Sequence, residues 1–572
     1  MQTPLEFVLG QEALADAAVW FFSARGDNAD IEAAFNAAFT RGTKTVHVVT
    51  SNANAKLLAL AGQHAGAQAH VIPVSTERDG FLATHSLVAA ALMWLRASDA
   101  VSDAPIGHAL LPEVRKHVLT RLSREERVHI AWKFRDLKTS DTLILLHDPR
   151  LFAAGTLIET SVWEAALCAI QRTDFRNFAH GRHVWLARRP ESAFLLSLTG
   201  IETRTLWDGL QVLAPNGLRH AGFDYNNCGR FECLIALVEA LVFVEAIGRA
   251  VDIDPAKPGV GRFGSGMYDD AALLDLSRRL GPAVRMKTAA VAKRDDPRLT
   301  ATDYYAAEQQ FRARLSTARF GGVVLDYDGT LVTTDARFDP PDREMMIQIG
   351  RLINAGVGVA ISTGRGGSAG EALREAVAQQ HHASIAIGYY NGAYVQMLDV
   401  DIRKTPPQAN ADVQSAASWL DRNRRFFTCF NIKNSGVQLT VEHRDLVNTA
   451  ELVDAISTAF PMLRTVESQH SLDIVPHAAC KTVVARLLAH KHSGADILCI
   501  GDSGHWRGND HVLLGEPFGV SVHRVCDRAE TCWTLFGPTL TGPAAVARIL
   551  RALAPDVGGL ARLDLSLLET GT

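Results

Sequence analysis

Two aspartates that directly follow an apolar segment constrain this chain more than any other feature. Residues 321–331 read Gly-Gly-Val-Val-Leu-Asp-Tyr-Asp-Gly-Thr-Leu, which predicts a buried strand that ends in a tight turn. Asp326 and Asp328 then lie where open α/β sheets bind ligands. Such a pair can hold Mg²⁺, attack phosphorus and move a proton. Because Asp-x-Asp-Gly also occurs in structural turns, the pair alone leaves a structural role open.

Three later segments end in polar residues that suit a phosphate and metal site. Residues 357–365 predict a second apolar strand that ends in hydroxyl side chains, and Lys481 opens a helical stretch. Residues 496–502 predict a third apolar strand that ends in Asp502, with Asp510 just beyond. Phosphoryl transfer requires positioning and charge neutralisation, and a hydroxyl, a lysine and a second acidic cluster supply both.

The order of these four motifs resembles the haloacid dehalogenase (HAD) superfamily of phosphatases over about residues 318–555. The resemblance implies that Asp326 is the nucleophile and Asp328 the general acid/base. Thr363 would bind the transferring phosphoryl group, and Lys481 would neutralise its charge. The expected substrate contacts in this part of the chain are Gly364, Arg365 and Asn391.

The same resemblance implies Mg²⁺ as the cofactor, bound by Asp326, by the backbone carbonyl of Asp328 and by Asp502, with Asp510 in support. The fourth motif is longer than the usual form, since residues 501–510 read Gly-Asp-Ser-Gly-His-Trp-Arg-Gly-Asn-Asp. Asp510 therefore either supports the metal or only caps a following helix. The role of the long loop 503–508 stays open.

Motif spacing predicts an inserted cap domain. The interval between Thr363 and Lys481 holds a further domain, whereas that between Asp326 and Thr363 does not. Residues 386–396 resemble the Asn-Gly-Ala strand that precedes the α/β cap in the sugar-phosphatase-like branch of the superfamily. We expect the HAD core at 319–394 and 473–560 and the cap at 395–472. Such a cap excludes water and selects the leaving group.

Length, charge and cysteine pattern narrow the class of protein. A chain of 572 residues implies about three to five domains. The 58 basic and 62 acidic side chains form no long run of either sign, which argues against nucleic acid or a membrane as partner. No signal-peptide order or long apolar segment stands out. The 8 cysteines form no Cys-x-x-Cys pair, so we expect a cytoplasmic location.

The N-terminal part contains a second phosphate-site pattern. Residues 18–35 predict a strand, a small-residue loop and a helix, and such a loop at a helix N-terminus binds anions. The loop resembles the Ser-x-Ser-Gly-x-Thr-x-Asp loop of the phosphosugar-binding sugar-isomerase (SIS) fold. Ser23, Gly26 and Asp30 match it, while Arg25 and Asn28 replace a serine and a threonine. The resemblance implies a phosphosugar contact from Ser23, Arg25, Gly26 and Asn28.

Residues 79–87 look like the SIS segment that adds hydroxyls to the same pocket, here those of Thr84 and Ser86. An ordinary helix start capped by Asp79 or Thr84 is the alternative. Farther along, a helix and a His-Gly turn resemble the second half of tandem isomerase domains. This resemblance makes Glu159, Glu164 and His180 candidates for acid/base work, with a structural role of the histidine as the alternative.

These patterns together predict an α/β protein of Rossmann-like doubly wound parallel sheets. We expect SIS-like domains at 1–138, apparently without the first strand, and 139–288, followed by a linker helix at 289–318. The expected function is a Mg²⁺-dependent phosphatase that hydrolyses a phosphorylated sugar or related metabolite through a phospho-aspartate. The SIS module would bind a phosphosugar, with isomerase activity left open, or would be a non-catalytic sensor or assembly module. By analogy with the SIS family, we also expect a homodimer that forms through the SIS module.

Overall fold

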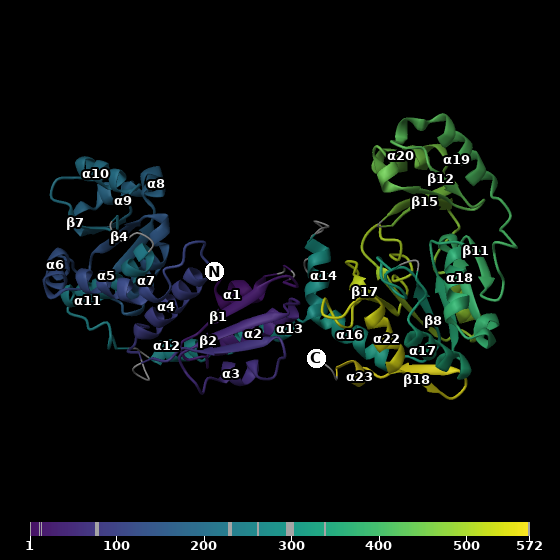
Figure 1. Cartoon of the computed structure of the whole chain (residues 1–572), viewed down its shortest axis with the longest axis horizontal. Helices are drawn as coiled ribbons and strands as arrows, with labels where there is room; N and C mark the ends of the chain where they lie inside the picture. The colour runs from purple at the N-terminus through teal and green to yellow at the C-terminus, as the bar shows by residue number, and fades with distance from the viewer. Residues whose placement is uncertain are drawn as a thin grey trace. The chain divides into compact units, whose positions relative to one another are not determined.

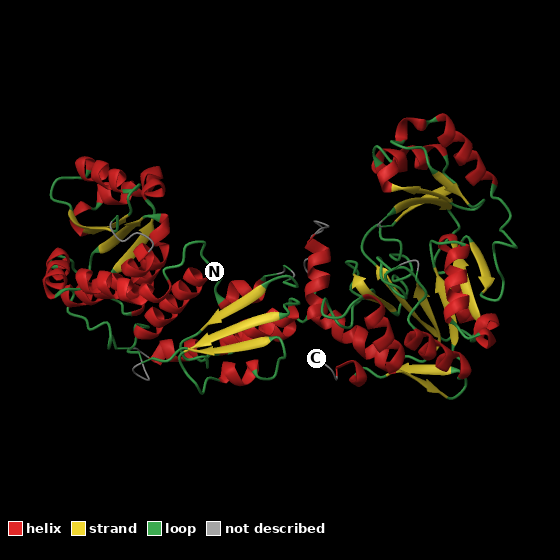
Figure 2. Cartoon of the chain, in the orientation of Figure 1, coloured by secondary structure: helices red, strands yellow, loops and turns green. Residues whose placement is uncertain are grey.

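The computed structural model describes residues 2–569 except 11, 13, 75–78, 227–230, 260–261, 293–301, 337–338 and 469. Backbone contacts divide the chain into two compact units. One comprises Met1–Val19, Glu32–Thr45 and Ala271–Thr572, and the other comprises Trp20–Ile31 and Val46–Asp270. Both combine sheets with helices (Figure 2), which confirms the α/β class. This division differs from the expected linear boundaries, because segments of 1–138 and 139–288 group with the C-terminal part.

The first unit contains a large sheet, of which Figure 1 labels β8, β11, β17 and β18. Its strands follow the order β11-β10-β9-β8-β16-β17, with β19 also paired to β8 and β18 paired to β19. β8, β9, β10, β16 and β17 run parallel to one another, whereas β11 is antiparallel to β10, β19 to β8 and β18 to β19. Their bounds are β8 Phe320–Asp326, β9 Gly358–Ser362, β10 Ile385–Tyr389, β11 Tyr394–Met397, β16 Asp496–Ser503, β17 Gly519–Arg524, β18 Leu553–Asp556 and β19 Leu560–Leu563.

Helices cover both faces of this sheet. Val323 and Leu325 of β8 pack in one apolar cluster with Ile349 of α17, whereas Val324 packs in another with Leu488 of α21. The alternation follows from the two-residue period of a strand. It also places Asp326 on the same side of β8 as Val324, toward α21. The helices that cover the two faces are α16 Tyr304–Thr317, α17 Arg343–Asn354, α18 Gly367–Ala376, α21 Val483–Lys491 and α22 Gly542–Ala552.

A second, antiparallel sheet of order β12-β13-β15-β14 forms the expected cap fold with two helices. Its elements are α19 Ala411–Arg422, β12 Ile432–Asn434, β13 Leu439–Glu442, α20 Thr449–Ala459, β14 Leu463–Glu467 and β15 Ser471–Pro476. Leu439 and Ile474 of the sheet pack with Leu420 and Ile456 of the helices. Sheet membership shifts the expected range 395–472 at both ends, because β11 pairs in the large sheet and β15 pairs in the cap.

The second unit contains a parallel sheet of order β5-β4-β6-β7. Its strands are β4 Thr142–His147, β5 Ala169–Thr173, β6 Ala193–Thr199 and β7 Arg219–Asp224. The surrounding helices are α4 His85–Ala100, α5 Leu110–Arg121, α6 Arg124–Phe134, α7 Phe152–Glu164, α9 His183–Arg188, α10 Arg204–Leu213 and α11 Glu232–Ala250. Phe134, Phe194 and Phe243 are buried together in its core.

A three-stranded sheet of order β1-β2-β3 contains the expected strand, loop and helix near the N-terminus. Its elements are β1 Ala18–Phe22, α2 Ala29–Thr40, β2 Thr45–Thr50, α3 Lys56–Ala61 and β3 Ala67–Val71. Other helices are α1 Pro4–Leu9, α12 Arg262–Tyr268, α13 Ala272–Arg279, α14 Pro282–Ala292 and α23 Ser566–Glu569. Of the expected linker helix, residues 302–318 are described and contain α16, while residues 293–301 lie outside the described residues.

Within the part of the chain that the structure describes, no helix has both the length and the apolar character to cross a membrane.

Candidate active site

Asp326 ends the central strand β8 and is buried under the residues that follow it. Its Oδ1 accepts a hydrogen bond from Lys481 Nζ at 2.5 Å, and its Oδ2 accepts one from Thr330 Oγ1 at 3.4 Å. Thr330 is itself fully buried. Sequence reasoning quoted Thr330 within the first motif without assigning it a role. Lys481 and the turn residue Thr330 thus each hold one oxygen of the expected nucleophile.

Lys481 lies just before α21 and contacts two carboxylates. Its carbonyl oxygen accepts a hydrogen bond from Ser362 Oγ at 3.1 Å, which ties the start of the helix to the end of β9. Its Nζ donates to Asp510 at 2.6 Å as well as to Asp326. The side chains of Lys481 and Asp326 are each only 2% exposed, and that of Asp510 is fully buried. Lys481 thus bridges the first and fourth motifs.

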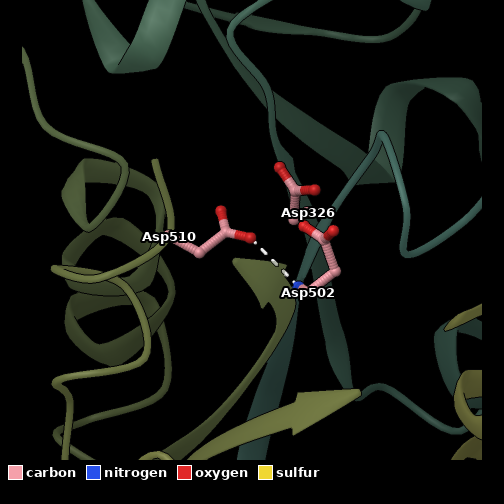
Figure 3. Close-up of side chains that lie close together, drawn as sticks. All are labelled: Asp326, Asp502 and Asp510. Carbon is pink, nitrogen blue, oxygen red and sulfur yellow. Dashed lines mark hydrogen bonds between the residues drawn. The ribbon is translucent and has the colours of Figure 1, made fainter. Parts of the chain in front are cut away.

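The long fourth motif returns Asp510 to the site. Asp510 Oδ2 accepts hydrogen bonds from the backbone amides of Asp502 at 3.0 Å and Ser503 at 3.1 Å, the first of which is drawn in Figure 3. Residues 511–518, all of which the structure describes, form turns rather than a helix. The alternative that Asp510 only caps a following helix does not fit this arrangement. Within the loop, Trp506 is exposed and lies edge-on to His511.

Carboxylate oxygens of Asp326, Asp502 and Asp510 lie within 4.8 Å of one another and suit a metal ion (Figure 3). Burial, and then the Asp510 charge, raise the pKa of Asp326 well above its usual range. The same two causes raise the pKa of Asp502 to about 8. Two buried carboxyl groups and the partly buried Asp502 carboxyl surround one ammonium group, and a hard divalent cation would offset the negative charge that they carry once deprotonated. An all-oxygen donor set of this kind fits Mg²⁺.

Electrostatics also fix the charge state of Lys481. Burial alone opposes a charged ammonium group, but the carboxylates of Asp326 and Asp510 outweigh burial and raise the pKa of Lys481. A buried cation held between two carboxylates is suited to neutralising negative charge that gathers on a phosphoryl group.

Asp328 and Thr363 lie beside this cluster and share a contact with Arg365. Asp328 Oδ1 accepts from Arg365 Nη1 at 3.5 Å, and the guanidinium carbon lies 5.1 Å from the centre of the Tyr327 ring. Thr363 is buried, and its Oγ1 accepts from the backbone amide of Arg365 at 3.0 Å. The Asp328 side chain is 35% exposed, unlike Asp326. Asp328 is therefore open to solvent, as a group that exchanges protons with a leaving oxygen and with water must be.

Asn391 and Gly364, both expected to contact substrate, lie in a hydrogen-bond network with the cap sheet. Asn391 Nδ2 donates to Gln438 Oε1 and to Asp473 Oδ2, each at 3.0 Å. Gln438 Nε2 donates to the Gly364 carbonyl at 3.0 Å, and Thr440 Oγ1 donates to Asp473 at 2.8 Å. Sequence reasoning missed Gln438 and Thr440, although they alternate with the apolar residues of β13. The network joins the cap to the end of β9.

We expect Asp473 to make unfolding pH-dependent. Burial raises the pKa of Asp473 to about 6, above the value of about 3.9 in an unfolded chain. Its contribution to stability is therefore present at low pH and is lost as pH rises from about 4 to about 6. The free energies of unfolding of the protein and of Asp473→Asn, measured with urea, should differ by about 1–3 kcal/mol more at pH 7 than at pH 4.5. A difference in free energy that is the same at both pH values would contradict this expectation. The control is Asp412→Asn, at an exposed position in α19.

Gly329 is expected to be required for metal binding. Its φ of +77° favours glycine, and a Cβ at this position would overlap the Asp502 carboxylate. Gly329→Ala should lower the Mg²⁺ affinity, measured by calorimetry, by about tenfold or more. A loss of about 1.4 kcal/mol in binding free energy is enough for a tenfold change. Gly558→Ala is the matched control, because Gly558 has a φ of +80° with open space around it. Equal Mg²⁺ affinity in the two variants would contradict this assignment.

The N-terminal loop is a compact turn that opens α2. Ser23 Oγ accepts from the Gly26 amide at 3.1 Å, and Asn28 Oδ1 accepts from the Asp30 amide at 2.7 Å. Gly26 has a φ of +69°. The Arg25 carbonyl accepts from Asn52 Nδ2 at 3.0 Å. The expected strand, loop and helix are thus present, while ligand binding by these residues stays a prediction.

Thr84 and Ser86 both direct their hydroxyls to Asp79. Thr84 Oγ1 donates to Asp79 Oδ1 at 2.8 Å, and Ser86 Oγ donates to Asp79 Oδ2. Asp79 also accepts from the Ser86 amide at 3.4 Å in the first turn of α4, whereas Thr84 makes no side-chain cap. This geometry favours the alternative of a helix start capped by Asp79.

The three expected acid/base residues of the second sheet have different surroundings. Glu159 of α7 accepts from Arg172 Nε at 2.6 Å. Glu164 ends the same helix, and burial raises its pKa. His180 is exposed in the turn Phe178–Arg182, where Gly181 has a φ of +117°. The acid/base role of each of the three stays a prediction, and Glu159 already forms an ion pair with Arg172.

Comparison with known proteins bears on both parts of the chain. Residues 323–445 match the family model of haloacid dehalogenase-like hydrolases. No curated protein matches the chain. Among solved structures, a tagatose-6-phosphate ketose/aldose isomerase from Escherichia coli is 14% identical, with 45% of this chain and 76% of that chain covered and a TM-score of 0.37.

Two further solved structures resemble the chain. A HAD/COF-like hydrolase from Plasmodium vivax is 17% identical, with 42% of this chain and 98% of that chain covered and a TM-score of 0.32. A subclass IIB sugar phosphatase of the HAD superfamily is 17% identical, with 40% and 96% covered and a TM-score of 0.28. At these scores the likenesses carry no argument about function.

Proposed function

Residues 323–445 belong to a haloacid dehalogenase-like hydrolase domain, and we propose on this premise that the chain is a Mg²⁺-dependent phosphatase that forms a phospho-aspartate. The observation that carries the proposal is the buried group of Asp326, Lys481, Asp502 and Asp510 at the carboxyl ends of β8 and β16. It combines a nucleophile, a cation and a metal-binding donor set in one place.

Asp326 is the proposed nucleophile. Its carboxylate oxygen forms a bond to phosphorus while the bond from phosphorus to the leaving oxygen breaks. Asp328 donates a proton to that leaving oxygen, and its carboxylate then takes a proton from the water that hydrolyses the phospho-aspartate. The Thr363 hydroxyl and Lys481 hold the phosphoryl oxygens. Asp326 and Asp502, with the Asp328 carbonyl, would hold Mg²⁺, which when bound neutralises charge on the phosphoryl group.

Asp510 is proposed as a positioning residue of the metal site. Both of its oxygens already accept hydrogen bonds, one from Lys481 and the other from two backbone amides. These contacts orient the Lys481 ammonium group and the turn after β16 that contains Asp502. Asp510 thereby acts on the metal through Asp502 and through its own charge.

The proposed substrate is a phosphorylated sugar or related small metabolite. The cap sheet contacts the end of β9 through Gln438 and Asn391, so it is placed to select the leaving group. In the second unit, the Ser23–Asn28 loop before α2 supports a phosphosugar-binding SIS module. We further propose a cytoplasmic homodimer formed through that module, with no nucleic-acid or membrane partner. A non-catalytic sensor role for the module is the second candidate.

The test is phosphate release from p-nitrophenyl phosphate and from a panel of phosphorylated sugars and nucleotides by the full chain. We expect release that requires Mg²⁺ and stops with a chelator. If no ester yields phosphate in a Mg²⁺-dependent way, the phosphatase proposal is wrong. A phosphosugar that raises the melting temperature but is not hydrolysed would favour the sensor role of the N-terminal module.

Mg²⁺ binding is expected to release protons. Because the pKa of Asp502 is raised to about 8, this carboxyl holds a proton at pH 7 that a metal ion must displace. Calorimetric titration with Mg²⁺ in buffers of different ionisation enthalpy should show release of about one proton at pH 7, and affinity should fall as pH falls. Asp502→Asn should remove most of this release. A binding enthalpy that is the same in all buffers would contradict the expectation.

A further inference from the structure

Two cysteines and a lysine are buried together outside the carboxylate cluster. Cys526 follows β17, and its backbone amide donates to Cys532 Sγ at 3.3 Å. Lys287 of α14 donates from Nζ to Cys526 Sγ at 3.9 Å. Cys526 is 2% exposed, and Cys532 and Lys287 are fully buried. Arg528 and Glu530 of the loop that connects the two cysteines are exposed.

Burial lowers the pKa of Lys287, so its ammonium form depends on an anion beside it. Its Nζ donates to the carbonyls of Arg528 and Thr531, each at 2.7 Å, and lies 4.9 Å from the centre of the Trp533 ring. Carbonyls and a ring attract the ammonium group but do not neutralise its charge. A buried charge is costly unless it is paired, and the Cys526 sulfur is placed to supply the opposite charge.

The two sulfurs differ in charge state. The hydrogen bond with Cys532, opposed by burial and aided by Lys287, lowers the pKa of Cys526 to about 6. Burial raises the pKa of Cys532 well above its usual range. The equally buried Cys499 of β16 also has a raised pKa. These shifts favour a thiolate on Cys526 beside a thiol on Cys532, which are the charge states of an attacking and a resolving cysteine, here in a buried pair.

Cys532 also contacts the loop of the fourth motif. Its φ of +58° is in the left-handed region, which cysteine rarely adopts and which the surrounding structure must enforce. Its sulfur lies so close to Gly504 that a Cβ at this glycine would overlap it. The Gly504 amide donates to the Arg524 carbonyl at 3.0 Å, and its carbonyl contacts His511 Nδ1 at 2.9 Å. Movement of the Cys532 sulfur would thus reach the loop between Asp502 and Asp510.

We propose that Cys526 and Cys532 are a redox-active dithiol that a hydroperoxide converts to a disulfide. The Cys526 thiolate attacks one peroxide oxygen and becomes a sulfenic acid, while the other oxygen leaves and, once protonated, forms an alcohol or water. The Cys532 sulfur then attacks the Cys526 sulfur, its proton is lost, and the sulfenic oxygen leaves as water. Two thiols are oxidised and one peroxide is reduced, and a dithiol reductant reverses the change.

The test treats the reduced full-length protein with stoichiometric hydrogen peroxide, blocks remaining thiols and maps peptides by mass spectrometry. We expect a Cys526–Cys532 disulfide before any oxidation of Cys499, and its loss after reduction. In Cys532→Ser, dimedone should trap a sulfenic acid at Cys526. Lys287→Met should slow the reaction at Cys526 by about tenfold, because the thiolate loses its cation.

Three outcomes would overturn the proposal. They are oxidation of other cysteines while Cys526 and Cys532 stay reduced, no dimedone adduct at Cys526 in Cys532→Ser, and an unchanged rate in a folded Lys287→Met variant. If Lys287→Met does not fold, the first two measurements decide. Because the readout is the covalent state of the sulfurs, failure here leaves the phosphatase proposal untouched. A Mg²⁺ titration of the oxidised form then measures whether the disulfide alters the Gly504 loop.

Discussion

Asp326→Asn is expected to lower Mg²⁺-dependent phosphate release by about 10³-fold or more. The amide cannot form the phospho-aspartate, and it removes one of the carboxylates in the proposed metal site. The asparagine keeps the size of the side chain and leaves Lys481 paired with Asp510, so the melting temperature without Mg²⁺ should fall less than in Lys481→Met. Steady-state hydrolysis of p-nitrophenyl phosphate and thermal unfolding measure the two effects.

The matched control for this variant is Asp496→Asn. Asp496 begins β16, the strand that ends at the metal site, and it is exposed. The control should hydrolyse the ester at the rate of the unmodified protein. Turnover by Asp326→Asn within about tenfold of the unmodified protein would exclude Asp326 as the nucleophile.

Lys481→Met is expected to have the largest effect on stability. The variant leaves Asp326 and Asp510 buried without the ammonium group that now lies 2.5 and 2.6 Å from them. Removing one partner of a buried ion pair costs about 3–5 kcal/mol. Urea unfolding without Mg²⁺ should show this loss, and phosphate release should also fall because the phosphoryl charge is not neutralised.

Added Mg²⁺ should recover part of the lost stability, since a bound cation offsets the same carboxylates. Lys491→Met is the control, because Lys491 ends α21 and is exposed. It should unfold at the same urea concentration as the unmodified protein. A destabilisation of Lys481→Met that is below about 1 kcal/mol would show that the buried ion pairs do not stabilise the site.

The residues at strand ends were predictable from the sequence. Asp326, Thr363 and Asp502 each follow an apolar segment, and the structure places those segments as β8, β9 and β16 in one sheet. Because the carboxyl ends of parallel strands meet at one edge, their order along the chain was enough to bring these residues together. The strand, loop and helix predicted at residues 18–35 also follow from local patterning, and the structure places them as β1 and α2.

Contacts that depend on loop geometry were not predictable. Asp510 lies eight positions after Asp502, and only the folded loop shows that its carboxylate accepts from the Asp502 amide. Asn391 suits a substrate contact by motif, yet its amide donates to Gln438 and Asp473 of the cap. Thr84 and Ser86 suit a pocket, yet their hydroxyls donate to Asp79. A side chain's partner in each case comes from a distant segment or from a turn.

The sequence by itself determined the α/β class, the strand ends that carry Asp326 and Asp502, and the position of Lys481 before a helix, because periodicity and motif order are local properties. Only the tertiary structure decided that Lys481 lies between Asp326 and Asp510, that Thr330 holds the second oxygen of Asp326, and that Lys287 lies beside Cys526. The Lys481 and Lys287 contacts join segments far apart in the chain, whereas the Thr330 contact depends on how the turn after β8 folds. Burial at these places sets the charge states that govern their chemistry.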